Sequence, residues 1–593
     1  MIDDPIGLAL VQKQLDHIAR QMGWVMMRTA RSPIFSQSHD FSCFIGDARG
    51  NVVSQADGLP IHTGGGSFAI KAVLDNFKEE IADGDVYILS DPYEAGGNHL
   101  PDWTIIRPVF VGGEMLAFCC NRAHQSDIGG GAAGTYNPAA TEIYHEGLRL
   151  PVLRLVDAGK TRTDLWRLLL INSRCPVLLD GDLRAMIGST EIGAARVAEA
   201  LSALPRETSL EYLEGILDYA ERLVLDEIGG LPCGVYEGED ESDNDCFGPA
   251  DIRVRVRITV SRNGLHVDFT GSSPQISGFK NSSIANTYSS VYLAVIAFLA
   301  PHLPKNDGAF RPITVVAPEG TIVNARPPAP MTMNTVFPAT NIVHACWKAL
   351  AACDPTRACA GWGKSLHCVT SGRAPNGETF VMYHWHGLPA AGAVQGRDGF
   401  PTMGTVPTLC GLRLPNVESY EQLYPITIQK YEMRCDGEGA GEFRGGPGID
   451  YVADIGIAAE YSFRGEGAHG LTAFGVNGGM AGRSGSLTLG TKDRLPIEVP
   501  QFGVRHLPPI RIVIASPGGG GFGDPMRRDP NSVLRDVADG VVSPAKAHET
   551  YATILTGSPL RVDAAATAAL RAQRALAGSP RMRKAPEVFD LER

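Results

Sequence analysis

The stretch DWTIIRPVFVGGEMLAFCCNRAH, residues 102–124, decides the fold of the N-terminal part of this chain. Two apolar runs are joined by Gly112 and Gly113, and glycines readily adopt the positive φ angles that a two-residue hairpin turn requires. With VYILS just upstream, at residues 86–90, these runs indicate a β-rich segment. The stretch therefore predicts an antiparallel hairpin.

The register of this hairpin brings two side chains with ligating atoms together at its open end. If Val111 pairs with Glu114, Asp102 lies opposite Ala123, and His124 lies diagonally beside Asp102. An imidazole and a carboxylate are therefore expected at the same end of the ribbon.

A third ligating side chain precedes the first strand. His99 stands three residues before Asp102 in HLPD, where the proline favours a tight connection over a regular helix. His99, Asp102 and His124 can thus converge without any assumption about long-range packing. Two imidazoles and a carboxylate suit a divalent ion such as zinc, manganese or iron, and three protein ligands leave positions open for water or substrate.

Further residues extend or challenge this interpretation. Asp40, Asp127 and His145 are candidates for additional ligands or for groups that orient the imidazoles, and a second H-x-x-D, from His124 to Asp127, leaves a two-metal site open. The alternative is two surface histidines and a turn-capping Asp102, since motif matches often arise by chance. A mononuclear iron oxygenase shares the same two-histidine, one-carboxylate set.

Other motifs favour structural roles. SPGGGGFGDP (516–525) contains GxGxxG but no helix follows it, and CAGWGKS (359–365) lacks the first glycine of a phosphate-binding loop. Residues 64–66 are three glycines before an expected helix. Free backbone amides there could bind an anion, but a packed turn is the commoner use of such an arrangement. His384 and His386 are expected on one face of a strand, as a buried or rim pair.

Composition excludes several classes of protein. The chain has 593 residues, of which 44% are hydrophobic and 20% charged, and this composition is typical of a globular protein. Its net charge is −12. A nucleic-acid or anionic-membrane partner is not expected. The start, MIDDP, lacks the features of a secretory signal, the longest apolar run (291–300) is too short to span a bilayer, and the 12 scattered cysteines suit a reducing cytoplasm.

Hydrophobic periodicity predicts an α+β, multi-layer mixed α/β protein. It indicates an amphipathic helix over 6–30, helices over 162–228, strands at 252–260 and 265–270, a β-rich region punctuated by glycine and proline after 387, and a helical tail over 544–577. The expected regions are an N-terminal α/β region with the metal site (1–160), a helical layer (161–235), a mixed region (236–430), a glycine-punctuated β-rich region (431–530) and a helical tail (531–593).

Longer strings resemble the hydantoinase B/oxoprolinase family. These are RTARSPIFSQSHDFSC (28–43), LSDPYEAGGNHLPDWTIIRPVF (89–110), NRAHQSDIGG (121–130), ATEIYHEGLRLP (140–151), FRGGPG (443–448) and SPGGGGFGDP (516–525). The match runs from about residue 4 to residue 525. The resemblance implies a subunit that works with a hydantoinase A-type partner, in a hetero-oligomer with two or more copies of each subunit.

The same resemblance implies residues and chemistry. The partner binds ATP and Mg and phosphorylates a carbonyl oxygen, and this chain then hydrolyses the activated hydantoin or lactam with a metal held by His99, Asp102 and His124. Asp40 and His145 match positions suspected to reach that site, where one of them would move a proton. SHD stands where a basic pair before Asp40 is expected, which leaves substrate contacts of that loop open.

Two other functions stay open at this point. Ketone carboxylation, as in the acetone and acetophenone carboxylase relatives, would use the same ligands to polarise an enolate oxygen, although the acetone carboxylase subunit is expected to be longer. A non-catalytic scaffold for the ATP-binding partner is disfavoured because all three expected ligands are present.

Overall fold

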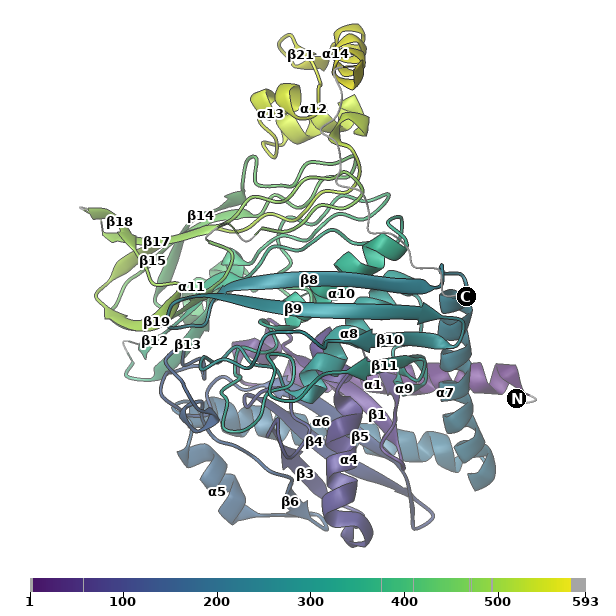
Figure 1. Ribbon diagram of the computed structural model, residues 1–593. Coiled ribbons are helices and arrows are strands. Elements are labelled where there is room, and N and C mark those ends of the chain that lie inside the picture. The colour runs from purple at the N-terminus through teal and green to yellow at the C-terminus, as the bar shows by residue number, and fades with distance from the viewer. Residues whose placement is uncertain are drawn as a thin grey trace.

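The computed structural model describes residues 4–576 apart from positions 57, 375, 409, 469, 471, 492 and 493. Within this part the chain forms several sheets covered by helices, which is the mixed α/β class expected from the sequence (Figure 1). Long strands cross the middle of the molecule, and the segment after residue 525 projects from one end of it.

The N-terminal region is built on a seven-stranded sheet with the strand order β2-β1-β5-β4-β3-β6-β7. Every pairing within it is antiparallel. Its strands are β1 (Phe41–Asp47), β2 (Val52–Gln55), β3 (Val86–Leu89), β4 (Asp102–Val111), β5 (Glu114–His124), β6 (Leu153–Asp157) and β7 (Lys160–Thr161). The predicted hairpin, β4 and β5, lies at its centre.

Helices cover both faces of this sheet. On one face, α1 (Pro5–Thr29) packs with α6 (Pro176–Ser202), and the apolar stripe of α1 that the sequence predicts is buried there. The helix begins one residue earlier than predicted, where the Asp4 carboxylate accepts a hydrogen bond from the Gly7 amide. On the other face, α4 (Gly66–Phe77) buries a second apolar cluster.

The register of the central hairpin differs by one residue from the predicted one. Val111 pairs with Glu114 as expected, but the register shifts between Phe110 and Val109. Leu116 has no partner there and forms a β-bulge. Asp102 therefore lies directly opposite His124, whereas the sequence placed it opposite Ala123. The predicted convergence of Asp102 and His124 is stronger than expected because the two residues form a direct pair.

The middle of the chain forms a second helical and β layer. Helices α5 (Thr163–Ile171) and α7 (Arg206–Gly229) lead into a sheet ordered β11-β10-β9-β8, packed against α8 (Ile284–Leu299) and α10 (Ala339–Cys353). The strands are β8 (Gly234–Asn244), β9 (Pro249–Ser261), β10 (Gly264–Asp268) and β11 (Ile313–Val316). The apolar run over 291–300 forms part of the buried helix α8, and no helix among the described residues is long and apolar enough to cross a membrane.

The β-rich C-terminal region contains two further sheets, ordered β13-β12-β16-β19 and β14-β15-β20-β17-β18. Their strands are β12 (Leu366–Arg373), β13 (Thr379–Tyr383), β14 (Ile426–Met433), β15 (Ile449–Ile455), β16 (Ala459–Gly465), β17 (Ser486–Thr491), β18 (Arg494–Glu498), β19 (Phe502–Leu507) and β20 (Ile510–Ala515). The glycine string after β20 is a packing device, as expected: a Cβ on Gly520 would lie 1.9 Å from the Phe474 carbonyl oxygen.

Two local predictions need correction or completion. β13 ends at Tyr383, so His384 and His386 lie in the following turn and not on one strand, although both are buried as expected. The glycines at 64–66 form a packed turn, since a Cβ on Gly64 would lie 2.8 Å from the Ser289 Cα.

The tail is not wholly helical. It contains the helices α12 (Pro530–Ala538), α13 (Pro544–Glu549) and α14 (Ala564–Leu576). A short hairpin of β21 (Leu555–Thr556) and β22 (Arg561–Val562) lies between α13 and α14, and Gly557 in its turn has a positive φ. Residue 577, the last of the predicted tail helix, lies outside the described residues.

Candidate metal centre

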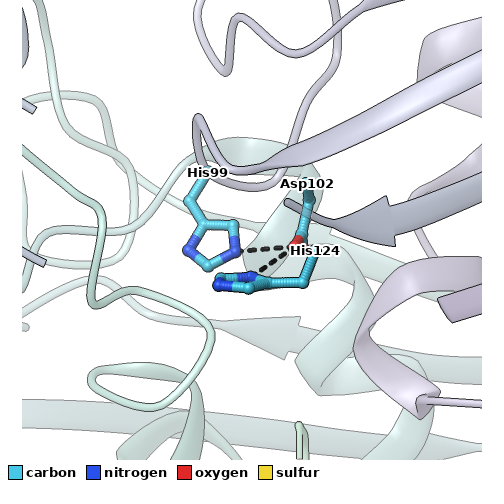
Figure 2. Close-up of side chains that lie close together, drawn as sticks. All are labelled: His99, Asp102 and His124. Atoms are coloured by element: carbon cyan, nitrogen blue, oxygen red, sulfur yellow. Dashed lines mark hydrogen bonds and ion pairs between the residues drawn. The ribbon is translucent and has the colours of Figure 1, made fainter. Parts of the chain in front are cut away.

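His99, Asp102 and His124 meet at the open end of the central hairpin (Figure 2). The Asp102 Oδ1 lies 2.8 Å from the His99 Nε2 and 3.1 Å from the His124 Nδ1. All three side chains are buried, with at most 4% exposed. Three ligand atoms within 4.8 Å of one another could hold a divalent ion.

The hydrogen bonds of His99 leave its Nε2 free for a cation. Its Nδ1 lies 2.5 Å from the Thr332 carbonyl oxygen, which can only accept, so Nδ1 carries a proton. The Nε2 has no hydrogen-bond partner, although the Asp102 oxygen is close, because the contact lacks hydrogen-bond geometry. A nitrogen lone pair facing a carboxylate is repulsive, whereas a cation between them would make both contacts favourable.

The tautomer of His124 follows from a similar chain of contacts. The Tyr383 hydroxyl lies 3.2 Å from both the Gly134 carbonyl oxygen and the His124 Nε2, and when it donates its single proton to the carbonyl oxygen, the His124 Nε2 donates to the hydroxyl oxygen. The Nδ1 lone pair then faces Asp102. Burial lowers the pKa of His124 to about 4 against the opposing effect of Asp102, so the ring is neutral at pH 7, as a metal ligand must be.

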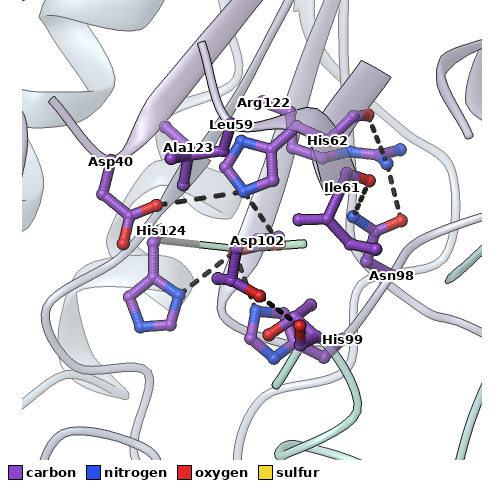
Figure 3. A network of polar contacts seen from close by, with 12 residues as sticks. Asp40, Leu59, Ile61, His62, Asn98, His99, Asp102, Arg122, Ala123 and His124 are labelled. Carbon is purple, nitrogen blue, oxygen red and sulfur yellow. Dashed lines mark hydrogen bonds and ion pairs between the residues drawn. The ribbon is translucent and has the colours of Figure 1, made fainter. Parts of the chain in front are cut away.

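Asp102 is the charged centre of the cluster. Burial alone would raise its pKa, but the imidazoles of His99, His62 and His124 beside it together hold the pKa of Asp102 well below its usual range. Its second oxygen, Oδ2, lies 3.2 Å from the His62 Nε2 (Figure 3). A carboxylate between imidazoles is a ligand set suited to a divalent cation.

His62 was not predicted from the sequence. It lies in α3 (Pro60–Thr63), where its Nε2 faces Asp102 (Figure 3). Its Nδ1 lies 3.3 Å from the Ser42 Oγ. Arg122 positions this short helix by donating to the His62 carbonyl oxygen at 3.1 Å and to the Asn98 side chain at 2.9 Å. Nothing near the sequence PIHTGGG marks a ligating residue, because these contacts come from a strand 60 residues away.

Asp40 reaches the cluster as expected. Its Oδ1 lies 3.9 Å from the His62 Nε2 and is buried without a hydrogen-bond partner. Burial, reinforced by the negative charge of Asp102, raises the pKa of Asp40 well above its usual value. A carboxyl group with a raised pKa holds its proton to a higher pH than an exposed one, which suits it to proton transfer.

These residues enclose a small cavity of about 10 Å³. That is close to the smallest space that holds one water molecule, so it fits a single ion or water. The Arg464 guanidinium lies 3.4 Å over the Tyr136 ring and supplies a buried positive charge at the wall. The wall consists of Asp40, His62, His99, Asp102, His124, Tyr136, Val336, Trp385, Thr408 and Arg464.

Two expected residues lie outside the cluster. His145 is exposed, because the turn points its neighbour Glu146 inward instead. The His145 Nδ1 accepts a hydrogen bond from the Thr141 amide at 3.4 Å. Asp127 accepts hydrogen bonds from the amides of its own loop and lies 3.0 Å from Arg174. The second H-x-x-D therefore stabilises a loop and brings no second ligand set to this cavity.

The chain belongs to the hydantoinase B/oxoprolinase family, whose model matches residues 4–525. It is 33% identical over 583 residues to the beta subunit of the caprolactamase of Pseudomonas jessenii, covering 96% of this chain and 99% of that protein. It is also 30% identical over 577 residues to the B subunit of a putative D-/L-hydantoinase from a Pseudomonas species, covering 94% and 96%.

Two solved structures share the fold. The ATP-dependent caprolactamase of Pseudomonas jessenii matches with a TM-score of 0.85 at 30% identity, over 96% of this chain and all of that one. A nucleotide-free acetone carboxylase matches with a TM-score of 0.86 at 20% identity, over 98% and 84%, which shows a common fold. The family expected from the sequence is thereby confirmed.

Proposed function

We propose that this chain is the metal-dependent hydrolytic subunit of an ATP-dependent cyclic amidase. In this proposal a hydantoinase A-type partner uses ATP and Mg to phosphorylate the carbonyl oxygen of a hydantoin or lactam, and this chain hydrolyses the activated ring. The carrying observation is that the His99 Nε2 and the His124 Nδ1 converge on one oxygen of Asp102 in a cavity of ionic size. The caprolactamase and hydantoinase subunits among the relatives support the substrate class.

His99, Asp102 and His124 would hold zinc, manganese or ferrous iron. An ion bound there supplies Lewis acidity and lowers the pKa of a coordinated water toward 7, which is about the value reached in zinc hydrolases. The chain contributes fixed tautomers, since Thr332 and Tyr383 hold the far nitrogens of the two imidazoles. The ligands therefore need no rearrangement to bind the ion.

Asp40 would accept the proton of the attacking water at its free Oδ1. Its raised pKa suits it to this transfer, and it would return that proton to the ring nitrogen as the C–N bond breaks, after which release of phosphate would complete the reaction. Arg464 would stabilise the negative charge that develops on the substrate, because it is a buried cation at the cavity wall. Tyr136 and Trp385 would exclude bulk water.

A second candidate function is ATP-dependent ketone carboxylation. The fold shared with acetone carboxylase favours it, because the same ligands could polarise an enolate oxygen. Hydrolysis is preferred because two relatives at 30% identity or more are named for a lactam and a hydantoin.

The proposed assembly is a hetero-oligomer with two or more copies of each subunit, in the cytoplasm. Both relatives are named as subunits, which supports a partner chain. All 12 cysteines are free thiols, which suits a reducing compartment.

A co-purified complex tests the proposed reaction. We would supply ATP and a panel of lactams, hydantoins and ketones, and measure ring opening, phosphate release and incorporation of labelled bicarbonate. ATP-dependent ring opening without label in the product is expected. Stable incorporation of the label into a product carboxylate would instead establish the carboxylase.

Variants link the reaction to the cluster. His124→Ala should abolish turnover and release the metal while the complex still assembles, and His506→Ala, an exposed histidine on β19, serves as the matched control. Asp40→Asn should lose turnover but retain the metal. Loss of metal from Asp40→Asn would reassign Asp40 as a ligand, and full activity of metal-free protein would refute metal-dependent hydrolysis.

A further inference from the structure

We infer that Glu146 is a positioning residue that fixes the orientation of His99 through the peptide groups of residues 331–332. This inference rests on the proposed function, since it assigns Glu146 to the metal centre described above. Glu146 touches neither the cavity nor any ligand directly, and sequence reasoning singled out its neighbour His145 instead.

The fold buries Glu146 and holds the backbone on both sides of it. It follows the short turn Ile143–His145, where Tyr144 and His145 are exposed while Glu146 has no exposed surface. The turn is attached to two other loops, because the Ile143 amide donates to the Pro328 carbonyl at 2.8 Å and the Leu148 amide donates to the Ile128 carbonyl at 3.0 Å. The backbone on both sides of Glu146 is therefore fixed.

The carboxylate of Glu146 makes a pair of contacts with backbone amides. Its Oε2 accepts from the Met331 amide at 2.9 Å and its Oε1 accepts from the Thr332 amide at 2.7 Å. Two amides that donate to the two oxygens of one planar carboxyl group fix its direction as well as its position. Met331 and Thr332 are themselves fully buried, so water cannot replace these contacts.

Thr332 connects Glu146 to the proposed metal ligand His99. The same residue whose amide is held by Glu146 presents its carbonyl oxygen to the His99 Nδ1. The segment is also held from the other side, since the Asn334 side chain donates to the Asn98 carbonyl at 2.7 Å. A displaced Thr332 carbonyl would release the Nδ1 proton from its acceptor and allow the ring to rotate or change tautomer.

The consequence is a chain of contacts from carboxylate to peptide to imidazole. Metal-ligating histidines depend on the acceptor of their second nitrogen, and loss of such outer contacts weakens metal binding by roughly 10–100-fold. Here the acceptor is a backbone carbonyl, which no substitution can delete. Glu146 is the side chain through which the acceptor can be moved.

Metal affinity of the full chain tests the inference. Zinc would be titrated in competition with a chromophoric chelator for the wild type, Glu146→Ala, Glu146→Gln and His99→Ala. Glu146→Ala should bind zinc roughly 10–100-fold more weakly. Glu146→Gln keeps one acceptor oxygen for the two amides, so an intermediate loss is expected.

Asp182 provides the matched control. It is a buried carboxylate on α6 that also accepts two backbone amides, those of Arg31 at 2.8 Å and Ser32 at 2.9 Å, and it is not part of the cavity wall. Asp182→Ala should lower the melting temperature as Glu146→Ala does but keep wild-type zinc affinity. An equal loss of affinity in both variants would overturn the inference, because it would show a general effect of destabilisation.

The remaining outcomes separate this inference from the proposed function. Wild-type affinity in Glu146→Ala, or in Glu146→Gln where the alanine variant does not fold, overturns the role of Glu146 alone. A wild type whose zinc affinity is unaffected by His99→Ala would overturn the proposed metal centre, and the inference would fall with it.

Discussion

Removal of the Tyr383 hydroxyl is the most informative single change at the site. In Tyr383→Phe the His124 Nε2 loses its acceptor, while the ring and its stacking on Trp385, at 4.8 Å between centroids, are retained. One buried hydrogen bond contributes about 0.5–1.5 kcal/mol net. Since about 1.4 kcal/mol is a tenfold change in a binding constant, metal affinity should fall about 2–13-fold.

The assay is a chelator competition on the full chain, with Tyr451→Phe as the control. Tyr451 is an equally buried tyrosine whose hydroxyl contacts a histidine outside the cluster, His384, at 3.2 Å. The control should lose stability but no metal affinity. Unchanged affinity in Tyr383→Phe, or an equal loss in the control, would refute the tautomer argument for His124.

Three further changes test the packing and charge of the fold. Burial, and then His386, lowers the pKa of His384 to about 3 from 6.5, so the unfolded chain binds more protons in that range. The free energy of unfolding should therefore fall as pH drops from 6.5 toward 3, and His384→Gln should flatten that fall in urea titrations. Glu466→Gln leaves the buried Lys280 ammonium without the carboxylate 2.5 Å away and should cost about 3–5 kcal/mol in chemical unfolding; a loss below 1 kcal/mol would contradict this. Gly520→Ala should lower the melting temperature, because the added Cβ overpacks the glycine string at a cost of about 1–3 kcal/mol or more. The control Gly188→Ala, which has open space at its Cβ in α6, should instead raise the free energy of unfolding by about 0.5–1 kcal/mol. The reverse order of the two variants would show that the glycine string is not close-packed.

The sequence predicted the parts of the site that local geometry determines. A two-glycine turn sets the pairing of β4 with β5, and HLPD adds His99 within three residues of Asp102. The one-residue error in register came from the bulge at Leu116, which the alternation of side chains does not reveal. The error did not matter for the site, because both registers place Asp102 and His124 at the same end of the ribbon.

Residues brought in by long-range packing could not be predicted. His62 reaches Asp102 because Arg122 and Asn98 hold α3 in place, and Glu146 acts through a loop about 185 residues further along the chain. The histidine in EIYHEG was expected at the site and its glutamate neighbour was not, because a single turn decides which of the two points inward. The sequence predicted which residue types meet at the hairpin end, but the contacts that orient their side chains depend on the tertiary fold.

X-ray absorption at the metal edge, on the full chain purified under metal-replete conditions, is the most direct test of whether His99, Asp102 and His124 bind a metal ion. A stoichiometric divalent ion with two imidazole ligands and oxygen donors in wild-type protein, lost in Asp102→Ala, is the predicted result. Protein without stoichiometric metal, or an identical spectrum after Asp102→Ala, would contradict the assignment of this cluster as a metal centre.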